Sequence, residues 1–255
     1  MNQLNVNLPE LPYAVSEAMN RLRINIKFCG KNTRKILLTS CQPNEGKSTI
    51  SSYLWKMLAE AGFPTVLVDV DLRKSVMKTR FQMDYDDDTT MGLNHYLSGM
   101  AEYEDVIYST NIPNGYMVPC TQLLENPSAL LEDIRFKELL NTLSENYRFV
   151  IIDSPPLGSV ADGALIASLC DGAVLVVRAG TTPRTLIKQS LYEIQQSGCK
   201  LLGTVLNRAD VKGRAYGKYG YGKYGYGYGY GYGYEPKDKK NSSDSAAADK
   251  NSTGK

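Results

Sequence analysis

A lysine and a serine that follow a glycine are the residues of this sequence best suited to phosphate chemistry. They belong to the stretch "CQPNEGKST" (41–49), which matches the phosphate-loop pattern GxxxxGK[ST] at Gly46, Lys47 and Ser48. Its first position is Cys41 instead of glycine, so the match is partial. Lysine suits the outer phosphates of a bound anion, and the Ser48 hydroxyl suits a Mg²⁺ ion.

The backbone of the same loop favours a phosphate site. An apolar strand enters the loop and an apolar helix leaves it, so backbone N–H groups would converge on an anion at the helix N-terminus. Asn44 follows Pro43 and can take the positive φ that glycine otherwise supplies. The alternative is a turn that happens to contain Gly-Lys-Ser. The anion site would be formed by Asn44, Glu45, Gly46, Lys47, Ser48 and Thr49.

Three aspartates follow or end apolar stretches elsewhere in the chain. Asp69 and Asp71 belong to "VLVDVDLR", and Asp153 belongs to "FVIIDSPP". Taken singly, an aspartate at a strand end is most often a helix cap or a turn residue. Ligands of α/β sheets bind at strand ends, so the three acids and the loop together predict a site for a nucleotide with Mg²⁺. Asp153 would hold the metal directly or through water, beside Ser48.

The elements that must position these residues alternate between strand and helix. Short apolar runs predict strands, and apolar residues at helical spacing predict helices. Strands are expected at 35–40, 65–71, 148–153, 172–177 and 201–207, and helices at 50–62 and 126–147. Strands separated by helices pair in parallel. The fold class is therefore α/β, a P-loop NTPase with a doubly wound, mostly parallel sheet and helices on both faces.

Three further segments are expected outside this alternation. Apolar residues at helical spacing predict an amphipathic helix over about 11–29, namely Leu11, Val15, Met19, Leu22 and Ile26. Within the less clear stretch 74–122, a short helix is expected at 91–99 and a solvated loop at 85–88.

Composition and charge limit the number of domains and the class of partner. The chain has 255 residues, of which 42% are hydrophobic. Without the C-terminal segment, about 210 residues remain, the size of one α/β domain. We therefore expect a domain at 1–210 and a flexible tail at 211–255. The formal net charge is only +2 and basic residues are spread along the chain, which gives no reason to expect nucleic acid as a partner.

The cysteines and the N-terminal stretch indicate a cytoplasmic protein. The five cysteines are odd in number and widely spaced, without a CxxC pair, so neither a disulfide framework nor a zinc site is indicated. The first residues lack a secretory signal pattern, and no apolar run approaches the roughly 20 residues that a membrane span needs. Membrane association would then come through a partner.

The tail contains a run of tyrosine and glycine at 216–234 that holds nine of the 18 tyrosines. Because so much glycine disfavours a stable isolated strand, we expect a flexible arm, on the order of 30 Å from end to end. From Glu235 onward the chain lacks apolar periodicity and is expected to be disordered. A self-associating aromatic segment is the alternative use of the run.

Taken together, the motifs resemble the bacterial tyrosine kinases (BY-kinases) of capsule and exopolysaccharide synthesis, specifically their separate cytoplasmic subunit in Gram-positive bacteria. The resemblance runs from about Pro12 to Asn207 and rests on "TSCQPNEGKST", "VLVDVDLRKSVM", "NPSALL", "FVIIDSPPLG", "GTVLNR" and the tyrosine-rich tail. It implies a kinase that uses ATP and Mg²⁺ to phosphorylate its own tail, usually on a neighbouring subunit. The acceptors would be Tyr216, Tyr219, Tyr221, Tyr224, Tyr226, Tyr228, Tyr230, Tyr232 and Tyr234.

The resemblance also implies roles for the acids. Asp69 would be the candidate acceptor for the proton of the substrate tyrosine. Asp71 and Asp153 would organise the metal, and Lys47 would neutralise charge on the phosphates. An unperturbed aspartate and tyrosine differ by about six pKa units, roughly 8 kcal/mol, so either the pKa of Asp69 is raised or the proton moves late. Asn207 resembles the adenine-contacting asparagine of related ATPases, and a plain turn residue is its alternative.

Assembly and partners follow from the same resemblance. Family members form rings through an E-x-x-R-x-x-R motif in the first helix, which corresponds here to Glu17, Asn20 and Arg23, so the middle arginine is absent. We expect a homo-oligomeric ring that uses Glu17 and Arg23. The family implies a membrane-embedded polysaccharide co-polymerase as activating adaptor and a tyrosine phosphatase. The chain would then be cytoplasmic, recruited to the inner face of the plasma membrane, and would regulate capsule synthesis and export.

An ATPase switch of the ParA/MinD type is the closest rival, because it shares the fold. Such proteins carry a second lysine one position after the first residue of the loop, where this chain has Gln42. They generally end in an amphipathic helix or a basic surface, which a Tyr-Gly arm does not replace.

Arg73 and His95 are further candidates near these motifs. Arg73 follows the paired acids and either contacts phosphate or forms an exposed salt bridge. His95 lies in the predicted short helix, where we expect a structural role.

Overall fold

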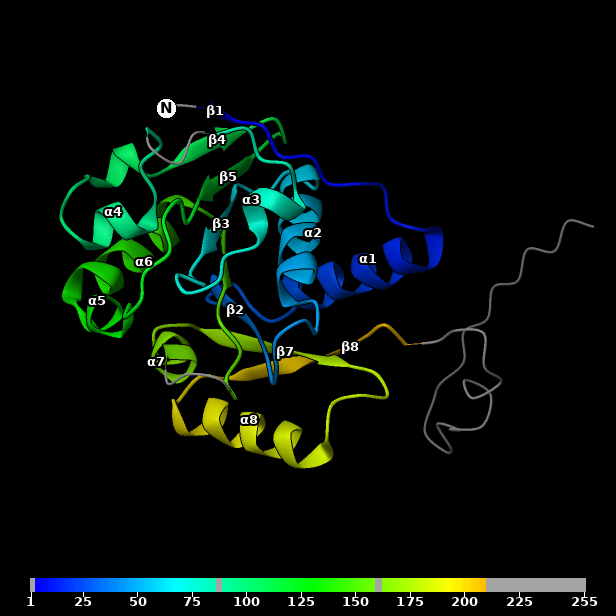
Figure 1. Ribbon diagram of the computed structural model, residues 1–255. Helices are drawn as coiled ribbons and strands as arrows, with labels where there is room; N and C mark the ends of the chain where they lie inside the picture. The colour runs from blue at the N-terminus through cyan, green and yellow to red at the C-terminus, as the bar shows by residue number, and fades with distance from the viewer. Residues whose placement is uncertain (1–2, 86–88, 159–161, 210–255) are drawn as a thin grey trace, which may run out of the picture. The chain divides into compact units, whose positions relative to one another are not determined.

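A mostly parallel sheet is the centre of the fold (Figure 1). The computed structural model describes residues 3–85, 89–158 and 162–209, so the tail, its tyrosines and most of the expected loop at 85–88 lie outside the described residues. Eight strands within them form the order β1-β4-β5-β3-β6-β2-β7-β8, and all neighbours are parallel except β4 and β5. The strands are β1 (Gln3–Leu4), β2 (Lys35–Ser40), β3 (Thr65–Asp69), β4 (Tyr108–Thr110), β5 (Gly115–Val118), β6 (Phe149–Asp153), β7 (Gly172–Arg178) and β8 (Leu201–Asn207).

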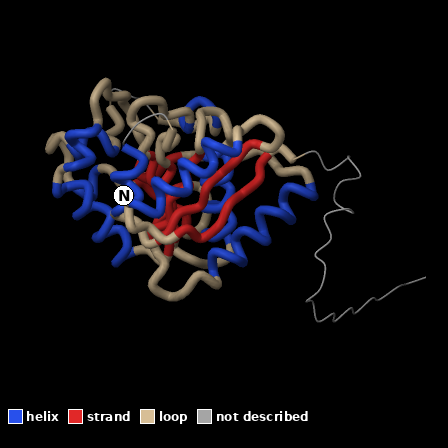
Figure 2. The backbone as a smooth tube through the Cα atoms, turned by 90° about the horizontal axis from the view of Figure 1, so that it is seen from below, coloured by secondary structure: helices blue, strands red, loops and turns tan. Residues whose placement is uncertain are grey.

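Helices cover both faces of the sheet, which confirms the doubly wound architecture (Figure 2). Leu37 of β2 packs on one side with residues of α4 to α8, while Ile36 and Leu38 pack on the other with residues of α1, α2 and α3. The helices are α1 (Tyr13–Lys27), α2 (Lys47–Glu60), α3 (Met77–Arg80), α4 (Leu93–Leu97), the 3-10 turn η1 (Tyr103–Asp105), α5 (Ser128–Glu132), α6 (Ile134–Asn146), α7 (Asp162–Ser168) and α8 (Arg184–Gln196).

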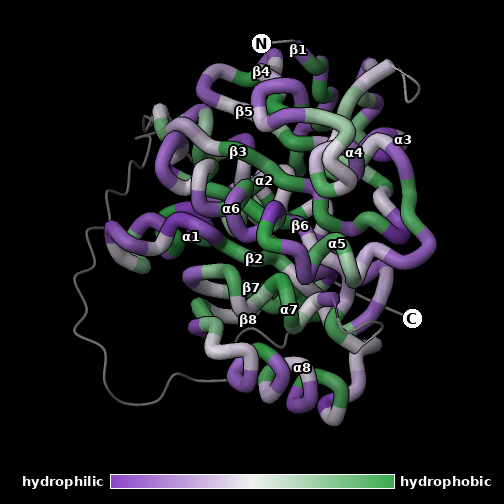
Figure 3. Tube along the Cα trace, turned by 90° about the vertical axis from the view of Figure 1, so that its left-hand side faces the viewer, coloured by the Kyte–Doolittle hydropathy of each residue, from purple (hydrophilic) through white to green (hydrophobic). Residues whose placement is uncertain are grey.

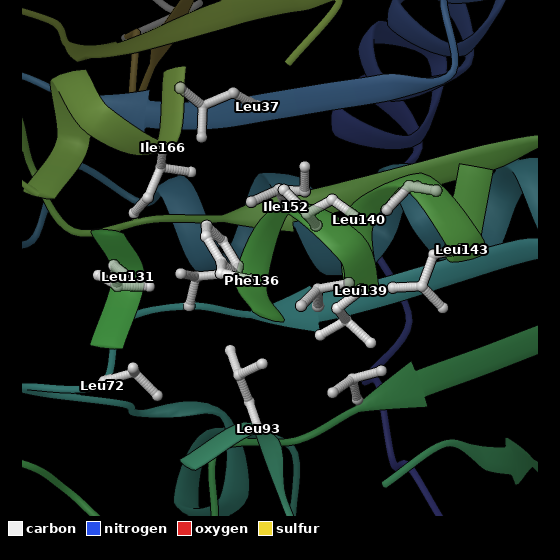
Figure 4. Close-up of a cluster of buried hydrophobic side chains, with 14 of the residues drawn as sticks. Leu37, Leu72, Leu93, Leu131, Phe136, Leu139, Leu140, Leu143, Ile152 and Ile166 are labelled. Carbon is white, nitrogen blue, oxygen red and sulfur yellow. The ribbon is translucent and has the colours of Figure 1, made fainter. Parts of the chain in front are cut away.

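The central strands read as continuous apolar runs because both of their faces are covered. Every residue of β3 and β6 is buried. Figure 3 shows hydrophobic residues along the central strands, whereas hydrophilic and hydrophobic residues alternate on α8. In Figure 4, Leu37 of β2 and Ile152 of β6 gather with Phe136 of α6 and Ile166 of α7. Burial of these strands holds their carboxyl ends, where the candidate residues lie, in fixed positions.

The helix predicted over 126–147 is wrong in one respect, because it is two helices. Asp133 has an extended backbone, with φ −65° and ψ 148°, and separates α5 from α6. Its side chain accepts a hydrogen bond from the N–H of Arg135 and so caps α6. An aspartate that caps a helix in this way competes with continuation of the helix before it.

The stretch 74–122 contains more structure than the expected short helix. That helix exists as α4, and β4 and β5 form an antiparallel pair next to the edge strand β1. The strand β1, the helices α3, α7 and α8, and the turn η1 also have no counterpart among the expected elements. None of the helices in the described part of the chain is long and apolar enough to cross a membrane.

Candidate functional site

The loop between β2 and α2 bends through two residues with positive φ. Asn44 has φ 65°, as its type and position predict, and Gly46 has φ 100°. The helix α2 begins at Lys47, three residues before its predicted start, and the N–H of Ile50 already donates to the carbonyl of Gly46. The first N–H groups of a helix lack acceptors inside it and attract anions. Lys47, Ser48 and Thr49 all belong to this first turn.

The side chain of Glu45 fastens this loop from within. Its Oε2 accepts hydrogen bonds from the N–H groups of Cys41 at 2.8 Å and Gln42 at 3.0 Å. The hydroxyl of Thr182, between β7 and α8, donates to Oε1. Glu45 is buried, so the carboxylate has exchanged water for these donors. Its backbone was predicted to bind an anion, but no local pattern in the sequence indicated this role for its side chain.

Lys47 lies between two buried carboxylates. Its Nζ is 2.9 Å from Oδ2 of Asp71 and 3.5 Å from Oδ2 of Asp153, and it also donates to the Ser48 hydroxyl at 3.4 Å. Oδ1 of Asp153 accepts from Ser51 at 3.1 Å. Burial alone would lower the pKa of Lys47, but the charges of Asp153 and Asp71 outweigh it and raise that pKa. The lysine therefore stays charged and holds the two acids together.

Asp69 lies beside this cluster without touching the lysine. Its Cα is paired with that of Asp153 across β3 and β6, so the parallel register brings the two acids to one edge of the sheet. Asp69 is only 1% exposed; its Oδ2 accepts from the Ser75 hydroxyl and its Oδ1 from the N–H of Asp71. Burial, followed by the charge of Asp153, raises the pKa of Asp69 to about 8.

A pocket of about 160 Å³ opens over the first turn of α2. Four basic residues and one acid, Asp71, line this pocket, so its wall is mainly positive. Arg80, one of them, also donates to the hydroxyl of Thr49 at 3.1 Å. The lining residues are Pro43, Asn44, Gly46, Lys47, Ser48, Asp71, Arg73, Lys74, Val76, Arg80, Pro155 and Pro156.

Asn207 approaches the loop from the end of β8. Its Nδ2 donates to the carbonyl of Glu45 at 2.8 Å, and it is not among the residues that line the pocket. A Cβ added at Gly46 would lie 2.1 Å from that Nδ2. Only a glycine at position 46 therefore accommodates this contact without a shift.

The other candidates have hydrogen-bond partners outside the cluster of Lys47, although Arg73 also lines the pocket. Arg73 forms a salt bridge in which its Nε lies 2.8 Å from Oδ2 of Asp162. Asp162 is buried, so this is not the exposed salt bridge that was expected. His95 accepts from the N–H of Gly92 at the start of α4, which fits a structural role. Glu17 and Arg23 lie on α1, where Arg23 donates to Oδ1 of Asn20, the residue at the position of the missing arginine.

Oxygen donors gather around Lys47 in a set that fits Mg²⁺. They are the hydroxyl of Ser48 and the carboxylates of Asp71 and Asp153. In the described ranges, no three His, Cys, Asp or Glu side chains are grouped so as to hold a metal by themselves. Mg²⁺ usually binds one or two carboxylates and completes its shell with water and ligand phosphates. The donor set therefore fits a metal shared with a phosphate-bearing ligand.

Comparisons with known proteins agree with this geometry. A family model described as an AAA domain matches residues 33–195. The tyrosine-protein kinase CpsD of Streptococcus agalactiae is 42% identical over 208 residues, which cover 81% of this chain and 90% of that protein. The kinase domain of the Escherichia coli tyrosine kinase ETK is similar in structure, with a TM-score of 0.69, 28% identity and coverage of 84% of this chain and 80% of that one. The septum site-determining protein MinD of Pyrococcus horikoshii, solved with Mg-ADP, has a TM-score of 0.56 at 25% identity and covers 68% of this chain and 69% of its own.

Proposed function

This chain belongs to the bacterial tyrosine-protein kinases and carries their AAA domain, and on that premise we propose that it phosphorylates its own C-terminal tyrosines with ATP and Mg²⁺. The acceptors would be the nine tyrosines of 216–234, which lie outside the described residues. The observation that carries the proposal is the buried Lys47 at the start of α2, held between Asp71 and Asp153.

Lys47 and the loop would bind the phosphates. Asn44, Glu45, Gly46, Ser48 and Thr49 would contribute backbone N–H groups at the start of α2. Lys47 would exchange a carboxylate partner for an outer phosphate, which costs little because one anion replaces another. Asn207, which already fastens Glu45, would contact the adenine.

Ser48, Asp71 and Asp153 would hold the metal. Mg²⁺, when bound there, supplies charge neutralisation on the phosphates during transfer. Lys47 would share that task, because its raised pKa keeps it charged over the physiological range. The chain's own contribution is to fix these groups in place on the buried ends of β3 and β6.

Asp69 would orient the acceptor tyrosine and take its proton. The phenol would replace the hydroxyl of Ser75 as the hydrogen-bond partner of Asp69. With the pKa of Asp69 at about 8, the difference from an ordinary tyrosine falls to about two units. The ionised form of Asp69 is the one that can accept this proton, and it can do so late in the reaction, since a loose transition state needs little charge on the nucleophile.

The wider role proposed for the chain is control of capsule and exopolysaccharide synthesis and export. Phosphorylation in trans would take place in a homo-oligomeric ring built with Glu17 and Arg23 of α1. A membrane-embedded polysaccharide co-polymerase would recruit the chain to the inner face of the plasma membrane and activate it, and a tyrosine phosphatase would reset the tail. Each added phosphate carries about −1.5 to −2 charge, which would expel the tail from an acidic site.

A MinD-type switch remains the second candidate because its fold is similar. It would hydrolyse ATP without labelling the tail. Gln42, at the position of the second lysine of such switches, lies in the loop and its N–H donates to Glu45. The tyrosine-kinase relatives favour the first proposal.

Mapping the modified residues separates the two candidates. The full chain is incubated with ATP and Mg²⁺, with and without the cytoplasmic segment of a candidate adaptor, and phosphotyrosines are located by mass spectrometry. We expect phosphate on the tyrosines of 216–234 and none in the Lys47→Met variant. ATP hydrolysis without phosphotyrosine in the tail would favour the MinD-type switch instead.

A further inference from the structure

Arg73, Ser128 and Asp162 form a closed triangle of hydrogen bonds next to the candidate site. Arg73 donates through Nε to Oδ2 of Asp162 at 2.8 Å and through Nη2 to the hydroxyl of Ser128 at 3.0 Å. That hydroxyl in turn donates to Oδ1 of Asp162 at 2.6 Å. All three side chains are therefore satisfied by one another, and the three segments that carry them are joined.

The negative charge of Asp162 is stabilised by the triangle and not by water. Asp162, the first residue of α7, has a side chain that is only 2% exposed, so its charge requires the guanidinium beside it. The remaining Nη1 of Arg73 donates to the carbonyl of Glu125 at 2.9 Å. Arg73 thus uses its planar set of donors on three acceptors, which a lysine cannot reproduce.

Arg73 stands two residues after Asp71 and four after Asp69, in the segment 69–75. The same segment is tied to the rest of the chain at Leu72, whose carbonyl accepts from the N–H of Leu124 at 2.8 Å. Arg73 and Leu72 therefore anchor the segment to 124–128, while Asp71 reaches Lys47. This arrangement gives a purpose to the "NPSALL" motif, whose serine is Ser128.

We propose that Arg73, Ser128 and Asp162 form a clamp that positions Asp69 and Asp71 for phosphoryl transfer, with Arg73 a positioning residue and not a phosphate contact. The clamp rests on the proposed function, because it serves the same site. Arg73 lines the same pocket as the loop 41–49, which would bind the phosphates, but its guanidinium donates to Asp162, Ser128 and the carbonyl of Glu125. Loosening the clamp should therefore impair transfer and the metal-dependent part of nucleotide binding, and spare nucleotide binding without metal.

The test uses the full chain in four variants, namely Ser128→Ala, Ser128→Thr, Arg73→Lys and Asp162→Asn. Ser128→Thr keeps the hydroxyl and serves as the conservative rescue. Ser144→Ala is the matched control, because that hydroxyl donates only to a carbonyl of its own helix, that of Asn141, in the described hydrogen bonds. ADP binding is measured by calorimetry with and without Mg²⁺, and tail phosphorylation is measured as kcat and KM for ATP.

Ser128→Ala, Arg73→Lys and Asp162→Asn should lower kcat by about 10-fold to 100-fold, as expected for misplaced reacting groups. Metal-free ADP affinity should stay within about twofold, while the gain in affinity on adding Mg²⁺ should shrink several-fold. Ser128→Thr and Ser144→Ala should resemble the unaltered chain. The double variant Arg73→Lys with Ser128→Ala should be no worse than Arg73→Lys alone.

Two results would overturn the clamp. An equal loss of kcat and of metal-free ADP affinity in Arg73→Lys would make Arg73 a phosphate contact. An unchanged kcat together with an unchanged response of ADP binding to Mg²⁺ would leave the triangle without a role in the site. Failure of the proposed function gives a different result, because the unaltered chain would then show no tail phosphotyrosine. ADP binding with and without Mg²⁺ would still test the clamp in that case.

Discussion

Nζ of Lys47 lies 2.9 Å from Asp71 and 3.5 Å from Asp153, and the side chains of all three residues are at most 10% exposed. One cation thus holds carboxylates from the segment after β3 and from the end of β6 against the first turn of α2. Because a buried ion pair is strongly destabilised when only one partner is removed, the lysine should matter for folding as well as for transfer.

Lys47→Met should therefore destabilise the chain in the absence of nucleotide, by about 3 kcal/mol at pH 8. The loss should grow as the pH rises, because burial already raises the pKa of Asp153 and the change removes the lysine charge that lowers it. Urea denaturation at pH 6 and pH 8 measures it. Lys56→Met is the matched control on the same helix, since Lys56 forms only a partly exposed pair with Glu60, and should cost less than about 1 kcal/mol. Equal effects of the two changes would contradict the account.

Asp69→Asn should have the opposite effect on stability. The folded pKa of Asp69 is raised from 3.8 to about 8, so between these values the folded chain keeps a proton that the unfolded chain has lost. Its contribution to stability therefore falls as pH rises from about 4 to about 8. Asparagine does not titrate, so the stability of the variant relative to the unaltered chain should increase as the pH rises through this window. Thermal unfolding at pH 5 and pH 9 without nucleotide measures the difference. A stability difference that does not change with pH would refute the raised pKa.

Glu45→Ala should weaken ATP binding by about 10-fold to 100-fold. The change leaves the N–H groups of Cys41 and Gln42 without their acceptor. The N–H of Cys41 is buried, and an unsatisfied buried group costs about 1–3 kcal/mol. Glu45→Gln is the control, because its amide oxygen can accept from the loop while its NH₂ faces Thr182, and we expect it to retain most of the affinity. Nucleotide titration by calorimetry distinguishes them. An unchanged affinity in Glu45→Ala would show that the loop keeps its shape without this carboxylate.

Gly46→Ala should weaken nucleotide binding, because the new Cβ would lie 2.1 Å from Nδ2 of Asn207 and would displace this side chain from the carbonyl of Glu45. Gly62→Ala provides the comparison, since Gly62 also has a positive φ, of 87°, but no atom lies within 4 Å of its added Cβ. The strain of a left-handed alanine, about 1–2 kcal/mol, is common to both. Nucleotide binding and unfolding temperature should therefore fall much further for Gly46→Ala. Similar losses would mean that the contact with Asn207 is unimportant.

Much of the fold was predictable because buried parallel strands leave a strong local signal. The run at 35–40 matches β2 residue for residue, since a strand covered on both faces must be apolar throughout. The run at 201–207 matches β8 equally well, although this strand lies at the edge of the sheet and none of its residues is buried. The break at Asp133 was not predictable in the same way. A polar residue inside an amphipathic pattern is usually on the solvent side of a helix, and only the hydrogen bond to Arg135 reveals it as a cap.

The candidate site was also predictable only where local sequence patterns determine it. The local spacing of residues in the sequence predicts the loop and the three acids. The parallel pairing of β3 with β6 explains why Asp69 and Asp153 lie side by side. The contacts of Glu45 with Thr182 and of Arg73 with Asp162 join residues far apart in the sequence. A single sequence contains no local signal for such pairs, because the tertiary fold alone decides which distant side chains meet.

Phosphorylation between two differently disabled full chains tests the central claim most directly. The donor carries phenylalanine at all nine tyrosines of 216–234 and keeps its site, and the acceptor carries Lys47→Met and keeps its tail. Mixed with ATP and Mg²⁺, they should place phosphotyrosine on the acceptor's tail, and the signal should fall by about 100-fold or more when the donor also carries Asp69→Asn. An acceptor tail that stays unmodified by an intact donor, although the unaltered chain labels itself, would contradict transfer between subunits. Full labelling by the Asp69→Asn donor would contradict the role of this carboxylate.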